Sequence, residues 1–292
     1  MLDRVFAALV SRDPAGLAGT RYTENGVELP IGEGLWATAD SIGPYRHDFA
    51  DSANGQAAAF ATVTEGQTRS IMGLRASAED GRVGEIEVLV ARPPLFGGVS
   101  AFGDGPGQLD QSGGAAGEWF AEIPADRRMS RDELRRVANA YFTGLECNDG
   151  RGDYPFADDC IRIENGFRTT GVPTGSEGKT PYLEAFRAMS AKQQFESGFF
   201  RFVTRIRERR FPVIDEARGL VFAFAFFDHD GTVRDYALAD GTPRQGIERP
   251  FSWMIAEAFR IEDGLIRRIE ALMSEAPYGL RSGWPLGEGD IA

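Results

Sequence analysis

The sequence predicts an α+β protein built from two tandem copies of one domain. Residues 55–67 align without a gap with 219–231, and residues 79–94 align in the same way with 262–277. A repeat unit of roughly 90–150 residues is far too long for a solenoid, so the copies are expected to fold as two related domains. Each copy opens with a helical pattern and continues in strands, which is typical of helices packed on one face of an antiparallel sheet.

The two copies set the expected domain boundaries. Residues 1–93 form the first domain, which is the reduced copy and is expected to act as scaffold. Residues 94–128 are glycine-rich and form a linker, although their aromatic residues indicate that it packs against a domain. Residues 129–284 form the second domain, which is expected to hold the active-site cavity, and residues 285–292 form a tail.

Helical segments are marked by apolar spacing and by a start signal. Ser130 followed by Glu133 is a capping-box pattern, and apolar residues then repeat at helical spacing over 134–145. Residues 180–200 also have a helical pattern, which has no counterpart of this length in the first copy. A short helical pattern opens the first copy at 5–10.

The second copy contains long strands joined by tight turns. The sequences DHDG and EDG mark two of these turns, because glycine and aspartate favour turn geometry. The expected strands are 161–163, 203–214, 220–228, 250–262 and 265–274. Together with the helices, they predict a curved, mostly antiparallel sheet with helices on its concave side.

Composition argues against several classes of partner and compartment. The net charge of −12 disfavours binding to nucleic acid or to an anionic membrane, because both repel an acidic surface. No apolar stretch reaches membrane-spanning length, and the N-terminus lacks the charge pattern of a signal peptide. Cys147 and Cys160 are therefore expected to be free thiols in a cytoplasmic protein.

No metal or cofactor is expected. The two histidines, His47 and His229, are dispersed and give no zinc-like ligand spacing. The sequence also lacks a phosphate-cradling loop, and GDGPG lies outside the strand–turn–helix setting of a dinucleotide fingerprint.

Glu257 is the leading catalytic candidate. Alternation along strand 250–262 places it on one side with aromatic and aliphatic residues, namely Phe251, Trp253, Ile255, Phe259 and Ile261. A carboxylate in apolar surroundings is costly unless it is paired or protonated. The first copy has Leu74 at the aligned position, so the fold does not require a carboxyl group there. We predict a general acid or base with a raised pKa, and the alternative is a structural ion pair with an arginine.

Carboxylates shared by both copies are expected to be architectural. Glu270 aligns with Glu87, and Asp215 aligns with Asp51. A residue that is present in both a working and an idle copy is better explained by the fold than by catalysis.

Arginines and tyrosines are candidates to complete the site. If the run RFVTRIRERR is extended, Arg201 and Arg205 share a side, which is either a solvated face or part of the cavity where they hold an anionic oxygen. Tyr141 and Tyr236 either donate a hydrogen bond to a substrate oxygen or pack as ordinary amphipathic residues. Arg162 aligns with Tyr22, so a polar aromatic residue replaces charge in the first copy. The other expected lining residues, some of which would also suit a plain core, are Trp253, Phe224, Phe259, Met273 and Tyr45.

Three segments of the second copy resemble the NTF2-like superfamily, which includes SnoaL-like proteins and ketosteroid isomerases. They are the opening helix RRVANAYFTGLE, the step FADDCIRI and the closing strand pair WMIAEAFRIEDGLIRRIEAL. The resemblance covers residues 1–93 and 130–275 and implies two tandem cones, each a curved sheet closed by helices around an apolar interior. It also implies lyase, dehydratase or isomerase chemistry without a cofactor. Members that release formaldehyde from lignin-derived aromatic dimers fit an aromatic pocket with one acid–base group.

Three classes of function remain open. The leading one is a lyase acting on a hydrophobic aromatic small molecule, in which Glu257 moves the proton and Arg205 and Tyr141 complete the catalytic set. Its close alternative is a dehydratase or isomerase of a polyketide-like or steroid-like substrate. The second class is a non-catalytic module that holds an apolar ligand. The third is a structural dimerisation domain, because open sheets of this kind often pair, and the same reasoning predicts a homo-oligomer formed through the sheets.

Overall fold

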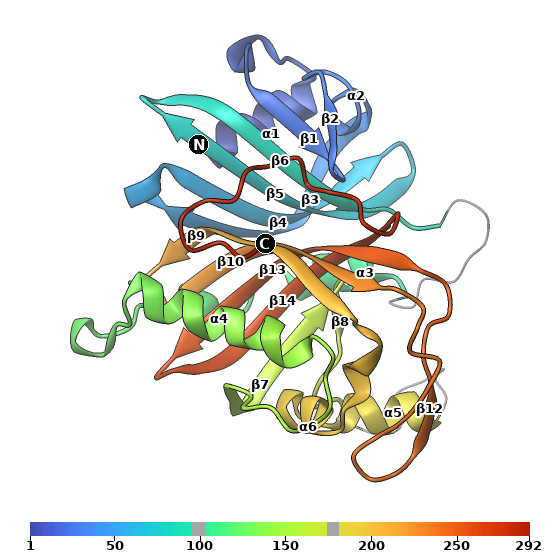
Figure 1. Cartoon of the computed structure of the whole chain (residues 1–292). Helices are drawn as coiled ribbons and strands as arrows, with labels where there is room; N and C mark the ends of the chain where they lie inside the picture. Colours follow the sequence, from blue (N-terminus) through green and yellow to red (C-terminus); the bar gives the residue numbers. More distant parts are fainter. Residues whose placement is uncertain (95–102, 174–180) are drawn as a thin grey trace.

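The computed structural model describes residues 1–94, 103–173 and 181–292 (Figure 1). The first half contains two helices and six strands. In chain order they are α1 (Leu2–Ser11), β1 (Arg21–Glu24), β2 (Val27–Leu29), α2 (Leu35–Thr38), β3 (Ala39–Asp51), β4 (Gln56–Glu65), β5 (Thr68–Glu79) and β6 (Arg82–Ala91).

The second half contains the longer helix and the longer strands. Its main elements are α4 (Arg131–Leu145), β7 (Phe156–Glu164), β8 (Phe167–Arg168), α5 (Pro181–Ala188), α6 (Ala191–Glu196), β9 (Arg205–Asp215), β10 (Leu220–His229), β13 (Phe251–Glu262) and β14 (Leu265–Ala276). A small hairpin, β11 (Asp235–Ala237) with β12 (Pro243–Gln245), extends from this half between β10 and β13. The four long strands expected here are confirmed, and the segment expected to be helical contains α5, α6 and a 3₁₀ turn.

Both halves form a six-stranded sheet with the same strand order. The first sheet runs β2-β1-β6-β5-β4-β3 and the second runs β8-β7-β14-β13-β10-β9. Each sheet has one parallel pair, β1 with β6 or β7 with β14, and its other pairs are antiparallel. The predicted α+β class is confirmed, and each sheet is mostly antiparallel with one parallel pair.

The two sheets pack against each other, and helices cover their outer faces. A first core, which includes Trp36, lies between α1 and the first sheet. A second core lies between the second sheet and the helices α4 and α6, which contribute Phe142 and Phe195. The third core joins the sheets, where the rings of Phe60 and Phe222 are 5.0 Å apart. The faces expected to pair between copies of the protein thus pair within one chain, and a homo-oligomer stays a prediction.

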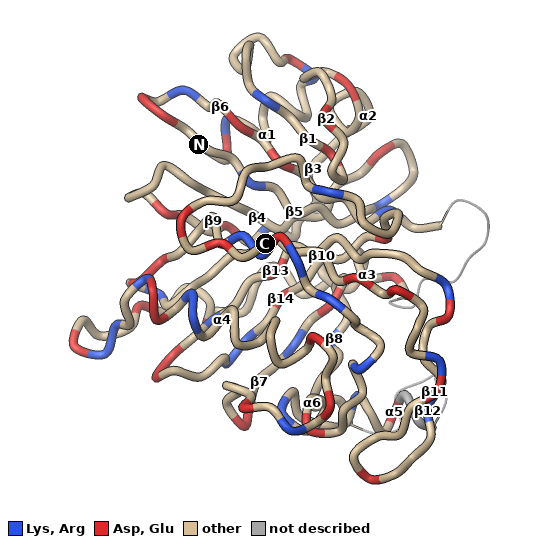
Figure 2. Tube along the Cα trace, viewed as in Figure 1, with Lys and Arg blue, Asp and Glu red and all other residues tan. Residues whose placement is uncertain are grey.

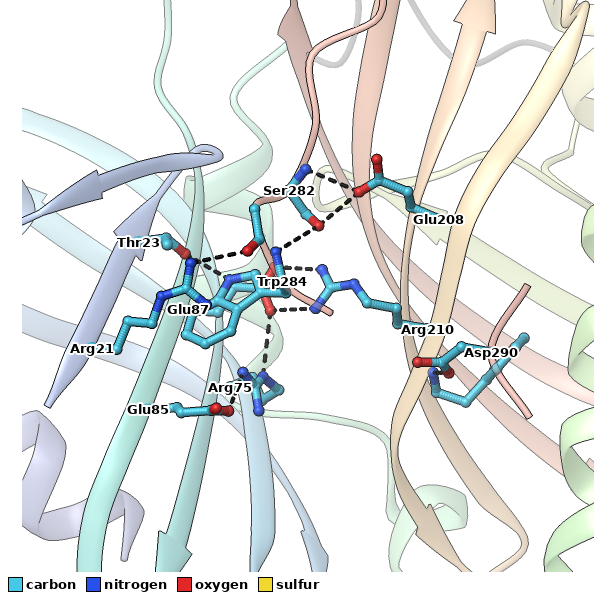
Figure 3. Close-up of polar contacts among 12 residues, drawn as sticks. Arg21, Thr23, Arg75, Glu85, Glu87, Glu208, Arg210, Ser282, Trp284 and Asp290 are labelled. Atoms are coloured by element: carbon cyan, nitrogen blue, oxygen red, sulfur yellow. Dashed lines mark hydrogen bonds and ion pairs between the residues drawn. The ribbon is translucent and has the colours of Figure 1, made fainter. Parts of the chain in front are cut away.

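The two shared glutamates face this contact between the sheets. Glu87 on β6 accepts hydrogen bonds from both terminal nitrogens of Arg210 on β9, at 2.8 and 2.6 Å (Figure 3). Glu270 on β14 accepts one from the Tyr45 hydroxyl at 2.7 Å and lies 2.7 Å from Nδ1 of His47, both on β3. Each carboxylate therefore links the two halves, which agrees with the expectation that they are architectural.

The C-terminal segment 277–292 crosses from the second half to the first. The Trp284 indole donates a hydrogen bond to Oγ1 of Thr23 at 3.0 Å (Figure 3). The guanidinium groups of Arg21 and Arg75 lie over the same ring, 4.1 and 4.7 Å from its centroid. Cation–π contacts of this kind add to the apolar burial of the indole, so this segment holds the halves together.

The described part of the glycine-rich segment, residues 103–128, is more ordered than a plain linker. It contains α3 (Gly105–Ser112), which the sequence analysis did not predict. Trp119 is buried against the ring of His47, with centroids 4.8 Å apart, and Ile123 is also buried. The expectation that its aromatic residues pack against a domain is confirmed for Trp119. Phe120 lies edge-on to the same His47 ring at 5.7 Å but is 48% exposed, and Phe96 and Phe102 lie outside the described residues.

The predicted start of the long helix is confirmed. The Ser130 hydroxyl accepts a hydrogen bond from the backbone of Glu133, whose carboxylate accepts one from the backbone of Ser130 at 2.9 Å. Ser130→Ala is expected to lower the free energy of unfolding by about 1 kcal/mol, because a backbone donor then loses its partner. Urea denaturation measures this loss. Ser11→Ala at an exposed helix end is the control and should change stability by less than about 0.5 kcal/mol.

Charged residues of both signs are interspersed along the trace of both halves (Figure 2). Many of them pair, so the acidic net charge of −12 arises without separating the two signs into different regions. No helix in the described ranges is long and apolar enough to cross a membrane.

Candidate functional site

Glu257 lies in the middle of β13, in the interior of the second half. Its side chain is 1% exposed, and it points to the helix-covered face with Ile255 and Phe259. The predicted alternation along this strand is therefore correct. In the sheet, Glu257 stands opposite Ala223 on β10 and Ala271 on β14, so its immediate neighbours across the strands are small.

Burial dominates the protonation behaviour of Glu257. Loss of solvation raises its pKa to about 8, and the nearby Glu164 carboxylate acts in the same direction. A hydrogen bond with Tyr141 and the charge of Arg162 oppose this shift, but only in part. The raised pKa of Glu257 therefore arises from burial, as predicted. No ion pair joins Glu257 to an arginine in the described part of the chain, which disfavours the ion-pair alternative.

Tyr141 brings α4 to the carboxyl group. It is fully buried, and desolvation together with the neighbouring Glu257 raises the pKa of its phenol well above the usual value. The phenol thus keeps its proton at any ordinary pH and acts as a hydrogen-bond donor. Its ring packs edge-on against Phe259 at 5.1 Å, so the predicted residues Tyr141 and Phe259 are next to Glu257.

Arg162 on β7 is the cation of this site, and the sequence analysis did not select it. It is 1% exposed, and its Nη2 donates a hydrogen bond to Oε1 of Gln194 at 2.5 Å. Interaction with the Tyr141 hydroxyl ties it to the same cluster. A signal was present in the sequence, because Arg162 aligns with Tyr22 just as Glu257 aligns with Leu74. Both charges occur only in the second copy.

Two predicted lining residues are at the margin of this cluster. Trp253 and Met273 pack against the second core and are partly exposed, as are Phe200 and Phe202 from the 3₁₀ turn Phe199–Phe202. These side chains lie where the second core meets solvent.

Phe224 does not face Glu257, and its prediction as a lining residue is wrong. It stands opposite Ala256 on β13 and belongs to the core between the sheets. Ala223 and Ala225 occupy the helix-covered side of β10 instead. All ten residues of β10 are buried, so alternation could not indicate which of its faces meets the helices.

The predicted arginines are also outside the site. Arg201 is exposed in the 3₁₀ turn before β9, and Arg205 is exposed at the start of that strand. Residues 201–202 belong to the 3₁₀ turn rather than to a strand, and Glu208 has a positive φ of 49° in a bulge that shifts the register with β10. The alternation assumed for this run therefore fails.

Arg205 lines a surface hollow of about 690 Å³ between β9 and the C-terminal segment, which excludes Glu257. Four further hollows, of about 10 to 510 Å³, exclude Glu257 as well.

Two predicted tyrosines have structural contacts elsewhere. Tyr45 belongs to the first half and donates its hydrogen bond to Glu270 between the sheets. The Tyr236 hydroxyl donates to the backbone carbonyl of Phe199 at 2.7 Å, which ties the β11–β12 hairpin to the 3₁₀ turn. Neither residue contacts Glu257, so the prediction that they belong to this site is wrong.

The described residues contain no group of three or more His, Cys, Asp or Glu side chains arranged to hold a metal ion. Cys147 and Cys160 are unpaired, as predicted.

Comparison with known proteins gives one family and one solved structure of note. A family model described as a domain of unknown function, DUF8021, matches residues 127–273. No curated protein matches the chain. A crystal structure described as a de novo designed protein with a curved β-sheet is 15% identical, with a TM-score of 0.29, and the match covers 50% of this chain and 88% of the designed one.

Proposed function

The chain belongs to the DUF8021 family, whose description names no activity, and we propose that its second half catalyses proton transfer on a hydrophobic, aromatic small molecule without a cofactor. The observation that carries this proposal is the buried carboxyl group of Glu257, which forms no ion pair with an arginine among the described residues. The first half has Leu74 at the aligned position, so a carboxyl group is not a requirement of the fold.

The acid–base properties of Glu257 support this role. With a pKa of about 8, both its protonated and its ionised forms are populated within about one pH unit of that value. Tyr141 stays protonated beside it and shares its single hydroxyl proton with Glu257, and in this proposal a reacting oxygen takes the place of that acceptor. Arg162 takes the place that the sequence analysis gave to Arg201 and Arg205, since it is the guanidinium group at this carboxyl.

We further propose that the second half is an NTF2-like cone. Its long helix α4 packs on the same face of the sheet to which Glu257 points, as in the architecture that the opening helix and closing strands resemble. In this proposal a substrate reaches Glu257 at the margin formed by the partly exposed Phe200, Trp253 and Met273.

The proposed reaction class is a lyase, with release of formaldehyde from lignin-derived aromatic dimers as its specific form. The aromatic margin and the single acid–base group favour it, because an aryl substrate can stack there while one proton is moved. A dehydratase or isomerase acting on a polyketide-like or steroid-like substrate uses the same residues. In the non-catalytic alternative, the same region of the second half binds an apolar ligand without converting it.

The test is turnover by the purified full chain with a panel of diarylpropane and phenylcoumaran dimers, steroids and polyketides, followed by mass spectrometry. We expect Glu257→Gln to abolish conversion and to retain ligand binding, because glutamine keeps the shape but cannot accept or release the proton. Glu262→Gln at the end of the same strand is the matched control and should convert substrate like the wild type. Unchanged conversion by Glu257→Gln would refute the proposed role, and binding without conversion by the wild type would support the binding module.

A further inference from the structure

The charge of Arg162 is only partly compensated by the described residues. One carboxylate among the described residues lies within ion-pair distance, with Oε1 of Glu164 at 3.5 Å from Nε, and the Glu257 carboxyl group acts on it without forming an ion pair. Its hydrogen-bond acceptors are neutral, namely Oγ1 of Thr169 at 3.2 Å and Oε1 of Gln194 at 2.5 Å. A guanidinium group that is 1% exposed has lost its hydration, so it favours a further anionic oxygen.

Arg162 and Glu257 each retain hydrogen-bonding capacity that the described protein groups do not use. Nη1 of Arg162 and Oε2 of Glu257 are buried atoms without a hydrogen-bond partner in the part of the chain that the structure describes. Both residues interact with the Tyr141 hydroxyl, so Nη1 and Oε2 belong to two side chains that lie next to the same phenol group. Buried polar groups in proteins are nearly always hydrogen-bonded, which makes this pair of atoms unusual.

Among Arg162, Glu257 and Tyr141, Arg162 is the residue that carries a permanent positive charge. Its Nε and Nη2 are engaged, so Nη1 is the nitrogen that offers N–H donors to a ligand. A carboxylate is the natural partner, because its hydrogen bond to a guanidinium is charge-assisted and about twice as strong as a neutral one. The face of the guanidinium lies over the Phe200 ring at 5.2 Å, so a ligand anion would lie next to an aromatic surface.

We propose that Arg162 binds the carboxylate of an aromatic acid and that such acids are the substrate class of this site. This inference rests on the function proposed above. The aryl group of the ligand lies toward Phe200, Trp253 and Met273, and its carboxylate oxygen accepts a hydrogen bond from Nη1. Glu257 then faces the atoms next to the carboxylate, where a proton is exchanged.

The inference predicts how pH controls binding. The charged or titratable groups that act on Glu257 are Tyr141 from α4 and Arg162 and Glu164 from β7, whereas its neighbours on β10 and β14 are alanines. Below pH 8 Glu257 is neutral and does not repel a bound carboxylate. Above pH 8 it is ionised, so acid affinity should fall by up to about tenfold per pH unit.

The experiment is calorimetric titration of the full chain with 3-phenylpropionate and with its neutral analogue 3-phenylpropanamide at pH 6.5. We expect the acid to bind at least tenfold more tightly than the amide, and Arg162→Gln to abolish this preference. Arg209→Gln is the matched control, because Arg209 is also buried, at 5% exposed, but is paired with Glu146. The preference should survive in that variant. Equal affinities in the wild type, no binding of the acid, or a preference that survives Arg162→Gln would each overturn the inference.

A pH series on the unmodified protein keeps the test independent of whether Arg162→Gln folds. Acid affinity should decline above pH 8 while amide affinity stays constant, and Glu257→Gln should remove the decline. A flat acid profile in the wild type would overturn the inference. Conversion of neutral substrates without acid preference refutes this inference alone, whereas acid preference with full conversion by Glu257→Gln refutes only the proposed catalytic role.

Discussion

Glu87→Gln is expected to lower the free energy of unfolding by about 3–5 kcal/mol. Glu87 holds Arg210 through two hydrogen bonds and lies 3.3 Å from Nε of Arg75, and all three side chains are nearly inaccessible to solvent. Glutamine leaves both guanidinium groups in the interior without their shared counter-charge. The hydration that these guanidinium groups lost on folding is then no longer offset by the Glu87 carboxylate. Urea denaturation at neutral pH measures the difference in the free energy of unfolding.

Glu270→Gln is the matched comparison, because Glu270 is the equivalent residue in the second copy. Its partners are the Tyr45 hydroxyl and the His47 ring rather than arginines. An amide oxygen can still accept one of these hydrogen bonds, so the expected loss is about 1–3 kcal/mol. Glu85→Gln, which removes a half-exposed partner of Arg75, should cost less than about 1 kcal/mol. Equal losses for all three variants would contradict the assignment of Glu87 as the buried counter-ion.

The comparison of the two copies predicted that these glutamates are structural, but not what they contact. Alignment of a repeat with itself shows which residues both copies retain. It contains no information on how one copy packs against the other, and Arg210, Tyr45 and His47 all reach across that contact. The domain boundaries drawn from the alignment likewise remain a prediction, since Trp284 from the last segment is part of the contact with the first half.

Elements with a local signal were predicted well. The capping box at Ser130 and the apolar periodicity of 134–145 gave α4, and the turns at DHDG and EDG gave the ends of the long strands. Helix α3 was missed because its sequence, GPGQLDQS, is rich in glycine and has a weak apolar pattern. Its N-terminus depends on Asp104, which accepts a hydrogen bond from the backbone of Gly107.

The site was predicted where one face of a strand differs clearly from the other. On β13 the alternation placed Glu257 correctly toward the helices, and Tyr141 followed from the apolar face of α4. On β10 both faces are buried, so Phe224 was assigned to the wrong one. Arg162 was overlooked because it lies in a short strand among residues of mixed character, and only its contrast with Tyr22 separates it from other arginines.

Glu257→Gln is expected to stabilise the protein at alkaline pH. In the unfolded chain a glutamate ionises near pH 4.5, whereas burial holds the proton on folded Glu257 until about pH 8. Between these values the folded state binds more protons than the unfolded state, so the stability contributed by this group falls as the pH rises. The separation of the two pKa values corresponds to a loss of roughly 3–5 kcal/mol that is complete above pH 8. This direction is opposite to that of a salt-bridged carboxylate.

Glutamine is neutral at every pH, so Glu257→Gln should resemble the wild type near pH 5 and exceed it by most of this amount at pH 9. Urea denaturation at pH 5, 7 and 9 measures the difference, and Glu262→Gln, which alters a partly exposed residue of β13, should leave the wild-type pH dependence in place. Parallel pH profiles for Glu257→Gln and the wild type would show that this carboxyl is not buried in protonated form. If instead the variant gains stability while losing turnover, the protein retains Glu257 as a proton carrier at the expense of stability. Functional residues are commonly retained in this way.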